Sequence, residues 1–430
     1  MIERYTLKEM KAIWSKEEKY KKWLLVELAV VEARSILGEI PSNVYDEIKK
    51  RALFDVKEIV KLEASLRHDL LAFVQNVQGY LGDYAGYFHY GLTSYDVEDP
   101  SLSLLIQNAS DIIIKDIESL VAILKDRARE FKDTIMVGRT HGVHAEPITF
   151  GFKLCVWMDE MRRNLERMKA VKEELRVGKI SGACGTYPVL SPEVERIALE
   201  RLKLKPAPIS TQVLQRDRHA HYLSVLAIIA SSLEDFATQI RLMQQTERGE
   251  VKEPFVRGQR GSSAMPHKQN PVISERICGL ARVIRSNLLS AMQNVALWDE
   301  RDISHSSVER IIIPDSTILL NYILNKFKYI VENLEVNKKR MYENLGMSGG
   351  IVFSQRVRLA LIEKGMLPDD AYTIVQSVAF RSMSENKSFR DILMEEKKVR
   401  GYLSSKEIDA CFDNSKILEN IFRILERCGV

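Results

Sequence analysis

The stretch RGQRGSSAMPHKQNP, residues 257–271, gathers hydroxyl, imidazole and cationic side chains between glycines and prolines. Gly258 and Gly261 allow tight turns, and Pro266 and Pro271 each bias the preceding residue away from the helical conformation. We therefore expect a shaped loop. Its side chains could perform acid–base chemistry on a bound substrate, although many Gly/Ser/Pro segments are merely connectors.

A second polar segment, GRTHGVHAEP, carries His141 and His144. Two histidines suggest zinc, but a zinc site needs further ligands, the helical H-E-x-x-H form is absent, and Gly142 argues against a regular helix here. An acid–base histidine held beside Arg139 and Thr140 is the favoured interpretation.

A third segment, HYGLTSYDVED, places Thr93, Ser94 and Asp96 just before a predicted helix. Such side chains often cap a helix by accepting backbone N–H bonds. The same hydroxyls and free amides at a helix start would also bind a carboxylate. Both interpretations stay open from the residues alone.

A fourth segment, ERDISHSSVER, holds Arg301 and Arg310 with three serines between them. Two guanidiniums with hydroxyls between them suit a phosphate, although a salt-bridged helix start would look similar. The loop of residues 257–271, called the glycine-rich loop below, does not have the G-x-x-x-x-G-K-[ST] order of a nucleotide-binding P-loop. Nucleotide-hydrolysing chemistry is therefore disfavoured. His219 and His221 are two residues apart and would point to different faces of a helix, which excludes a chelating pair.

Long helices must position these segments. Apolar residues recur at steps of three and four over about 100–131, 147–175, 222–243 and 273–298, and a fifth helix is predicted after Pro314. The first is expected to start with Asp99 as N-cap and Pro100 at the first helical position. Helices of about 30 residues would be about 45 Å long. Such rods expose apolar edges, so we expect burial against further copies of the chain.

The composition fits a mostly α protein, because 21 Gly and 12 Pro among 430 residues are few breakers. We predict three helical domains, at 1–95, 96–341 and 342–430, the middle one an elongated bundle of long helices. The charged stretch SKEEKYKK near the N-terminus is most simply a solvated helix face.

Composition also limits the partners and the compartment. The 63 basic and 59 acidic residues are interleaved, with no basic stripe for nucleic acid. Five scattered cysteines without a C-x-x-C pair fit reduced thiols in the cytoplasm. The N-terminus does not have the apolar stretch of a signal peptide, and the longest uncharged run is shorter than the roughly 18 residues of a membrane span. We expect a soluble protein that binds neither nucleic acid nor membranes.

Three segments, GLTSYD, GRTHGVHAEP and GSSAMPHKQNP, resemble in this order the signature regions of the fumarase/aspartase superfamily. Within that superfamily, ERY, HDLLAFV, FHYGLTSYD and RDISHSSVER resemble the adenylosuccinate lyase family over essentially the whole chain. One departure is Tyr95, where that family usually has a small hydroxyl residue. The resemblance implies a homotetramer whose central helices form one core, with each active site assembled from three subunits.

The resemblance also implies a reaction, the β-elimination of adenylosuccinate to AMP and fumarate and of the succinyl-carboxamide ribotide of purine synthesis. Ser262 would be the general base that takes a proton beside a carboxylate, and Lys268 would stabilise its alkoxide. His141 would be the general acid that protonates the departing nitrogen, with His68 in support. Glu275 would orient His141 or its network.

The substrate-binding residues implied by the resemblance fall into three sets, and neither a cofactor nor a metal is implied. Those for the succinyl part and its carboxylates are Thr93, Ser94, Thr140, Gln212 and Asn270, together with Lys268. Those for the nucleotide and its phosphate are Arg4, Tyr5, His89, Arg301, Ser306 and Arg310. Further contacts to substrate are expected from Arg67, His68, Asp69, Ser263 and Met265.

Two alternatives remain. Another fumarate-releasing lyase of the superfamily, such as argininosuccinate lyase, acts on a substrate without phosphate, and the arginine and serine cluster at 301–310 weighs against it. A helical scaffold without catalysis is the alternative from a different class, and a turnover assay separates all three.

Overall fold

The computed structural model describes residues 2–256 and 258–430. The chain forms two compact units. Unit 1 comprises Met1–Glu118, Arg162–Glu234 and Ile277–Lys326, and unit 2 comprises Ser119–Met161, Asp235–Arg276 and Phe327–Val430. The long helices contribute residues to both units. The division into three domains stays a prediction.

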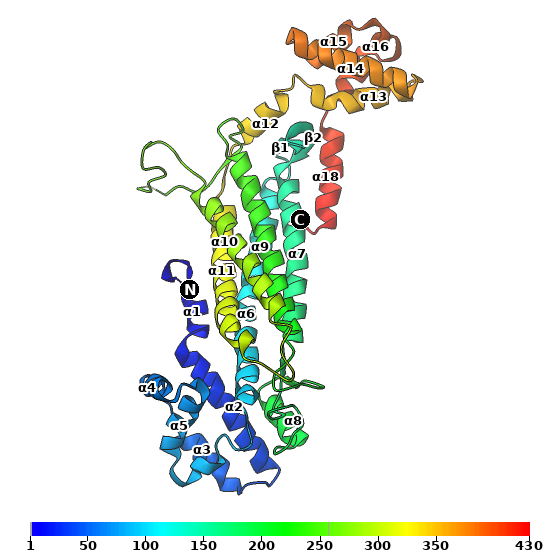
Figure 1. Ribbon diagram of the computed structural model, residues 1–430. Helices are drawn as coiled ribbons and strands as arrows, with labels where there is room; N and C mark the ends of the chain where they lie inside the picture. The colour runs from blue at the N-terminus through cyan, green and yellow to red at the C-terminus, as the bar shows by residue number, and fades with distance from the viewer. Residues whose placement is uncertain (1, 257) are drawn as a thin grey trace. The chain divides into compact units, whose positions relative to one another are not determined.

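Five long helices confirm the mostly α fold expected from the composition and periodicity (Figure 1). They are α6 (Ser94–Glu130), α7 (Phe150–Glu174), α9 (Asp217–Met243), α10 (Val272–Gln293) and α11 (Ser304–Asn333). Apolar residues on one stripe of α6, such as Ile113, Ile117 and Leu124, have no exposed surface. The stripe repeats at steps of three and four because those positions share one face of a helix.

The predicted starts of two of these helices were wrong. α6 begins at Ser94, and the carboxylate of Asp99 bonds Arg216 and the Leu214 N–H instead of capping the helix. α11 begins at Ser304 and continues through Pro314. A proline inside a helix removes one backbone hydrogen bond and crowds the carbonyl of residue i−4, at a cost of about 3 kcal/mol or more. Tertiary packing of the helix can offset this cost.

The segment predicted to connect the first two long helices is instead a β-hairpin. β1 (Ile135–Thr140) pairs antiparallel with β2 (Val143–Thr149). His141 and Gly142 form the two-residue turn with φ of 53° and 78°. Positive φ at both positions is the requirement of the type I′ turn that suits twisted strands. The helix predicted from residue 147 accordingly starts later, at the beginning of α7.

The remaining strands are short pairs between the helices. β3 (Val177–Gly178) pairs parallel with β4 (Lys205–Pro206), and β5 (Val251–Lys252) pairs antiparallel with β6 (Glu335–Val336).

Shorter helices surround the N-terminal core of unit 1. They are η1 (Glu3–Tyr5), α1 (Lys8–Ile13), α2 (Lys16–Ile36), α3 (Ser42–Arg51), α4 (Val56–Leu66), α5 (Asp69–Leu81), η2 (Gly82–Tyr87) and α8 (Pro192–Arg201). Trp23 on α2 meets Phe73 on α5 edge to face, with ring centroids 5.5 Å apart. The chain enters α5 through His68, whose ring nitrogen Nδ1 accepts the Leu71 N–H as an N-cap.

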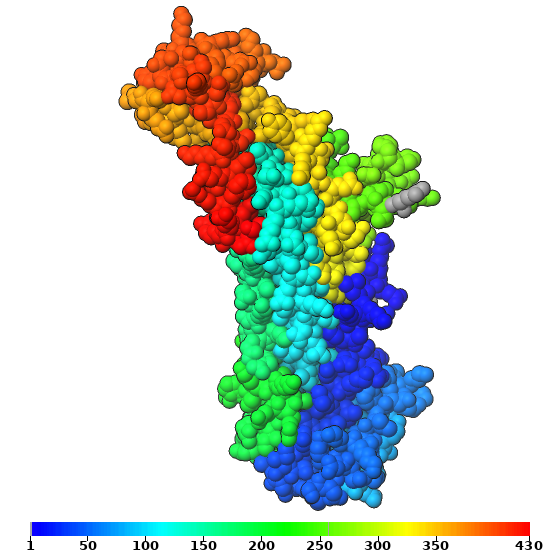
Figure 2. Space-filling model, turned by 180° about the vertical axis from the view of Figure 1, so that it is seen from behind, coloured from blue at the N-terminus to red at the C-terminus, as the bar shows by residue number. Residues whose placement is uncertain are grey.

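The C-terminal helices belong to unit 2. They are α12 (Lys338–Gly346), η3 (Ile351–Phe353), α13 (Ser354–Glu363), α14 (Pro368–Glu385), α15 (Phe389–Glu395), α16 (Lys397–Tyr402), α17 (Ser405–Cys411) and α18 (Ser415–Arg427). α13 to α17 share a small apolar core that includes Phe389 and Leu393. α18 lies against β2, and Figure 2 shows this last helix in red on the surface.

α9 is long and apolar enough to cross a membrane, with a mean hydropathy of 1.3 over its most apolar window. Most of that window, 61 %, is buried inside the protein. Length and hydropathy of this kind are also typical of a core helix, and the burial favours that interpretation of α9.

Candidate active site

The first cluster of predicted site residues lies where α5, α6 and α11 meet in unit 1. Arg310 on α11 bonds the Asp69 carboxylate at 2.8 Å, and Lys19 bonds the same oxygen at 3.0 Å. Burial opposes ionisation of Asp69, but Lys19 and Arg310 outweigh it and lower its pKa. Lys19 also lies over the Trp23 ring. It is therefore a member of this cluster, whereas Lys16, Glu17 and Lys21 of the same segment are exposed, as expected of a solvated helix face.

Glu98 on α6 is the second carboxylate beside Arg310, at 3.5 Å. Burial and the nearby Asp69 raise the pKa of Glu98 to about 7. Arg310 is thus held between one firmly ionised carboxylate and one that titrates near neutrality.

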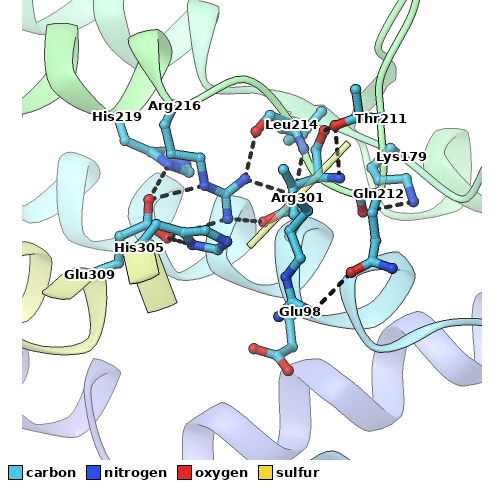
Figure 3. A network of polar contacts seen from close by, with 12 residues as sticks. Glu98, Lys179, Thr211, Gln212, Leu214, Arg216, His219, Arg301, His305 and Glu309 are labelled. Carbon is cyan, nitrogen blue, oxygen red and sulfur yellow. Dashed lines mark hydrogen bonds and ion pairs between the residues drawn. The ribbon is translucent and has the colours of Figure 1, made fainter. Parts of the chain in front are cut away.

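Figure 3 shows a second cluster, in which Gln212 links the segments that carry the predicted succinyl and phosphate contacts. Arg301 donates to the Gln212 side-chain oxygen at 2.9 Å, and the Gln212 amide donates to the Ala183 carbonyl. The guanidinium of Arg301 lies over the Tyr95 ring, 4.4 Å from its centroid. Tyr95 is only 4 % exposed, and burial raises its pKa to about 12, so its hydroxyl stays protonated.

A buried charge network lies beside this cluster (Figure 3). Arg216 is fully buried and bonds Asp99 at 2.8 Å and Glu309 at 3.1 Å. His219 and His305 both bond Glu309. Burial opposes ionisation of Glu309, but His219 and Arg216 hold its pKa well below the usual range. His219 bonds Glu309, whereas His221 bonds Glu174, so the two rings have different partners.

A cavity of about 290 Å³ lies beside these groups. Its walls carry Tyr95, Glu98, Ser306 and Arg310, and Lys19 lines it from α2. The cavity also carries further charges, and its lining includes four cations, Lys16, Lys19, Arg216 and Arg310, and three carboxylates, Glu98, Asp99 and Glu309. Together with its hydroxyl and aromatic surface, this lining can bind a ligand that has both polar and apolar parts.

A buried lysine contacts the segment HYGLTSYDVED. Lys179 bonds Asp96 at 2.6 Å, and both side chains are 1 % exposed. Asp96 also accepts the Thr93 N–H at 2.9 Å, and Lys179 donates to the Gln212 carbonyl at 3.1 Å. His89 bonds Glu27, which raises the pKa of His89 although burial opposes its charged form.

In unit 2 the hairpin presents His141 at its turn, where the residue is exposed. Arg139 on β1 makes two hydrogen bonds to Glu250, at 2.7 and 3.0 Å, and Glu250 has no exposed surface. Asn344 on α12 donates to the same carboxylate at 2.9 Å. A buried, bidentate pair of this kind fixes the strand that carries Thr140 and leads into His141.

The glycine-rich loop lies in the same unit, and its first residue, Arg257, is outside the described residues. Ser262 is half-buried, and its hydroxyl oxygen accepts the N–H groups of Ala264 at 3.2 Å and Met265 at 3.1 Å. The Asn270 amide donates to the Gly261 carbonyl. A Cβ at Gly261 would collide with the carbonyl oxygen of Lys268, so glycine is needed for the loop to close.

A larger cavity, of about 820 Å³, borders this loop. Met265, Lys268, Asn270 and Glu275 line it, and the C-terminal end of α9 supplies the opposite wall. This cavity brings together four of the residues that the resemblance assigned to catalysis and binding.

The predicted site residues therefore fall into two sets. In unit 1 lie Arg4, Tyr5, Arg67, His68, Asp69, His89, Thr93, Ser94, Gln212, Arg301, Ser306 and Arg310. In unit 2 lie Thr140, His141, Ser262, Ser263, Met265, Lys268, Asn270 and Glu275. Within unit 1, Arg4 and Arg67 are exposed, and Tyr5 packs edge to face on Tyr322 of α11.

Several polar residues of these clusters were missed by sequence reasoning. Lys19, Glu98, Lys179, Arg216 and Glu309 all contact predicted site residues or their neighbours. Only Glu309 carried a local signal, since it lies four residues after His305 on one face of α11. The other partners are far apart in sequence. Among residues 2–256 and 258–430, no three His, Cys, Asp or Glu side chains are grouped so that they could hold a metal ion.

The chain is similar to known lyases in sequence and in fold. A family model described as lyase matches residues 1–286, and one described as adenylosuccinate lyase C-terminus matches residues 350–428. Among solved structures, a fumarate lyase from Mesorhizobium sp. has a TM-score of 0.92 at 26 % identity, covering 100 % of this chain and 99 % of that one. A 3-carboxy-cis,cis-muconate lactonizing enzyme from Pseudomonas putida has a TM-score of 0.88 at 28 % identity, covering 99 % and 98 %. The fold and the loops together define a lyase of the fumarase/aspartase class.

Curated relatives identify the family within this class. An adenylosuccinate lyase from Aquifex aeolicus is 52 % identical, over 99 % of this chain and 98 % of the relative. An adenylosuccinate lyase from Bacillus subtilis is 50 % identical over the full length of both chains. The chain belongs to the adenylosuccinate lyase family.

Proposed function

We propose that this protein cleaves adenylosuccinate to AMP and fumarate by β-elimination, and the succinyl-carboxamide ribotide of purine synthesis in the same way. The observation that carries the proposal is the sequence identity to two adenylosuccinate lyases, 52 % and 50 %, over nearly the full length of each chain. The arginine and serine cluster of α11, which suits a phosphate-bearing substrate, supports the same conclusion.

Ser262 is the general base of the proposed reaction. Its oxygen already accepts two backbone N–H groups, and these donors would remain on an alkoxide. Hydrogen bonds to the charged form of a group favour that form. Lys268 in the same loop would add a positive charge beside it.

His141 is the proposed general acid for the departing nitrogen. The type I′ turn projects it from a hairpin that Arg139 and Glu250 hold in place. His68 is the proposed supporting group for this acid. The His68 Nδ1 accepts a backbone N–H, so in the neutral ring Nε2 carries the hydrogen and can donate a hydrogen bond.

Binding groups complete the proposed site. Arg301, Ser306 and Arg310, with Arg4 and Tyr5, would hold the nucleotide phosphate. Thr93, Ser94, Thr140, Gln212 and Asn270 would hold the succinyl carboxylates, and Glu275 would orient the acid. Many groups are needed because enzymes lower activation barriers by about 8–23 kcal/mol. One positioned acid or base accelerates a reaction about 10²–10⁴-fold, which is only roughly 3–5 kcal/mol of that barrier.

We further propose a homotetramer with active sites shared between subunits. Large apolar side chains on α10 and α11, including Leu289, Met292 and Ile311, are more than half exposed, and a second copy of the chain would bury them. We place the protein in the cytoplasm because its five cysteines are scattered along the sequence without a C-x-x-C pair.

The test is the turnover of adenylosuccinate, followed by absorbance, in wild type and Ser262→Ala. Loss of the base should lower kcat at least about 10²-fold and leave KM nearly unchanged. Ser286→Ala, which removes an exposed hydroxyl on α10 bonded only within its own helix, is the matched control and should keep wild-type turnover. A Ser262→Ala enzyme that keeps most of its kcat would place the base elsewhere, with Ser263 the first residue to examine.

A further inference from the structure

Tyr95 is the common neighbour of two residues that the proposed function assigns to the nucleotide phosphate. Its ring lies beneath the Arg301 guanidinium, and Ser306, which lines the same cavity as Tyr95, acts on the tyrosine hydroxyl. Arg301 lies between α10 and α11, and Ser306 is the third residue of α11, whereas Tyr95 is the second residue of α6. One side chain thus links both groups to the helix that carries Thr93 and Ser94 at its start.

Among the described residues, no carboxylate pairs with the Arg301 guanidinium, unlike those of Arg216 and Arg310. Arg216 is neutralised by Asp99 and Glu309, and Arg310 by Asp69 and Glu98. In the described part of the chain Arg301 makes no ion pair, its one hydrogen bond is to an amide oxygen, and its buried Nε has no partner. A half-buried guanidinium without a counter-ion fits an arriving dianion.

The Tyr95 ring explains how this cation is held without a carboxylate. The face of an aromatic ring attracts a guanidinium through its quadrupole and leaves the edge N–H groups available. The His305 ring meets Tyr95 edge-on, with centroids 5.3 Å apart, which fixes the ring in turn. A carboxylate in the same place would compete with the phosphate for the N–H donors.

We propose that Tyr95 is a positioning residue for the nucleotide phosphate, whose ring seats Arg301 and whose hydroxyl orients Ser306 toward the same phosphoryl group. This inference rests on the proposed phosphate role of Arg301 and Ser306. Because both side chains are already ordered before the substrate binds, less side-chain conformational entropy is lost on binding. Tyr95 itself acts through these two residues.

The test compares inhibition of wild type and variants by AMP and by adenosine, because the ratio of the two inhibition constants isolates the phosphate. Tyr95→Phe keeps the ring and loses the hydroxyl, and should reduce the preference for AMP about 3- to 10-fold. Tyr95→Leu loses both and should reduce it about 10-fold or more, as Arg301→Ala does, with the adenosine constant unchanged.

Tyr222→Phe is the matched control, since it removes another buried tyrosine hydroxyl that bonds Ser110 at 3.3 Å. Ser110 lies 15 residues beyond Tyr95 on the same helix, about 22 Å along its axis. This control should leave the AMP preference unchanged. If Tyr95→Leu does not fold, Tyr95→Phe decides the question.

The outcomes distinguish the positioning role of Tyr95 from the phosphate-binding role of Arg301 and Ser306. If Arg301→Ala and Ser306→Ala abolish the AMP preference but both tyrosine variants retain it, Tyr95 has no positioning role and the phosphate assignment stands. A tyrosine variant that weakens AMP and adenosine equally also overturns the proposal, because general loosening would then explain it. If no arginine or serine variant changes the preference, the phosphate assignment itself fails.

Discussion

The buried pair of Lys179 and Asp96 should be one of the costliest places to change a single charge in unit 1. Both side chains are 1 % exposed, and Lys179 Nζ has three oxygen acceptors, on Asp96, Gly182 and Gln212. Lys179→Met would leave the Asp96 carboxylate buried without its cation. Breaking a buried pair in this way costs about 3–5 kcal/mol of unfolding free energy.

The lower end of that range applies here, because Asp96 keeps hydrogen bonds from the backbone N–H groups of Thr93, Ser181 and Gly182. For a unit of this size, a loss of about 3 kcal/mol lowers the thermal midpoint by roughly 6–12 °C. The assay is thermal unfolding followed by circular dichroism at fixed protein concentration, since assembly changes apparent stability.

Two controls test the reasoning behind this magnitude. Lys61→Met removes the cation of an exposed pair with Glu58 and should give no measurable shift. The double variant Lys179→Met, Asp96→Asn removes both buried charges and should lose less stability than the two single variants summed. A Lys179→Met midpoint equal to that of Lys61→Met would refute the claim that the pair is shielded from water.

Two further predictions concern Glu98 and the sharing of sites. The pKa of Glu98 is raised from 4.5 to about 7, so the folded protein holds a proton that the unfolded chain releases, and stability is lost as pH rises through this window. The stability of Glu98→Gln relative to wild type should therefore increase between about pH 5 and 7 and then level off, and parallel denaturation curves would contradict this. If His141 and Ser262 reach one site from different subunits, inactive His141→Ala and Ser262→Ala proteins that are dissociated and reassembled together should recover about a quarter of wild-type activity. Recovery of none, with subunit exchange verified by mass, would exclude the shared site.

The sequence by itself determined the helical class and the chemical segments. Helix periodicity is local, because residues three and four apart share a face whatever surrounds them, so the five long helices could be predicted. The loop with Ser262 and Lys268 could be recognised for a similar reason. Its glycines and prolines act on their own backbone, and the structure places a glycine where a Cβ would collide at Gly261.

Only the tertiary structure decided how those segments are held. The partners of Asp96 and Arg301 lie 83 and 89 residues away, and no local pattern can select one lysine or one amide among many at that distance. Helix α6 starts at Ser94, and Asp99 bonds Arg216 across the fold although its local pattern favours a cap. The sequence shows Tyr95 where the family usually has a small hydroxyl residue. Its place beneath Arg301 depends on three helix ends meeting, and packing alone decides that.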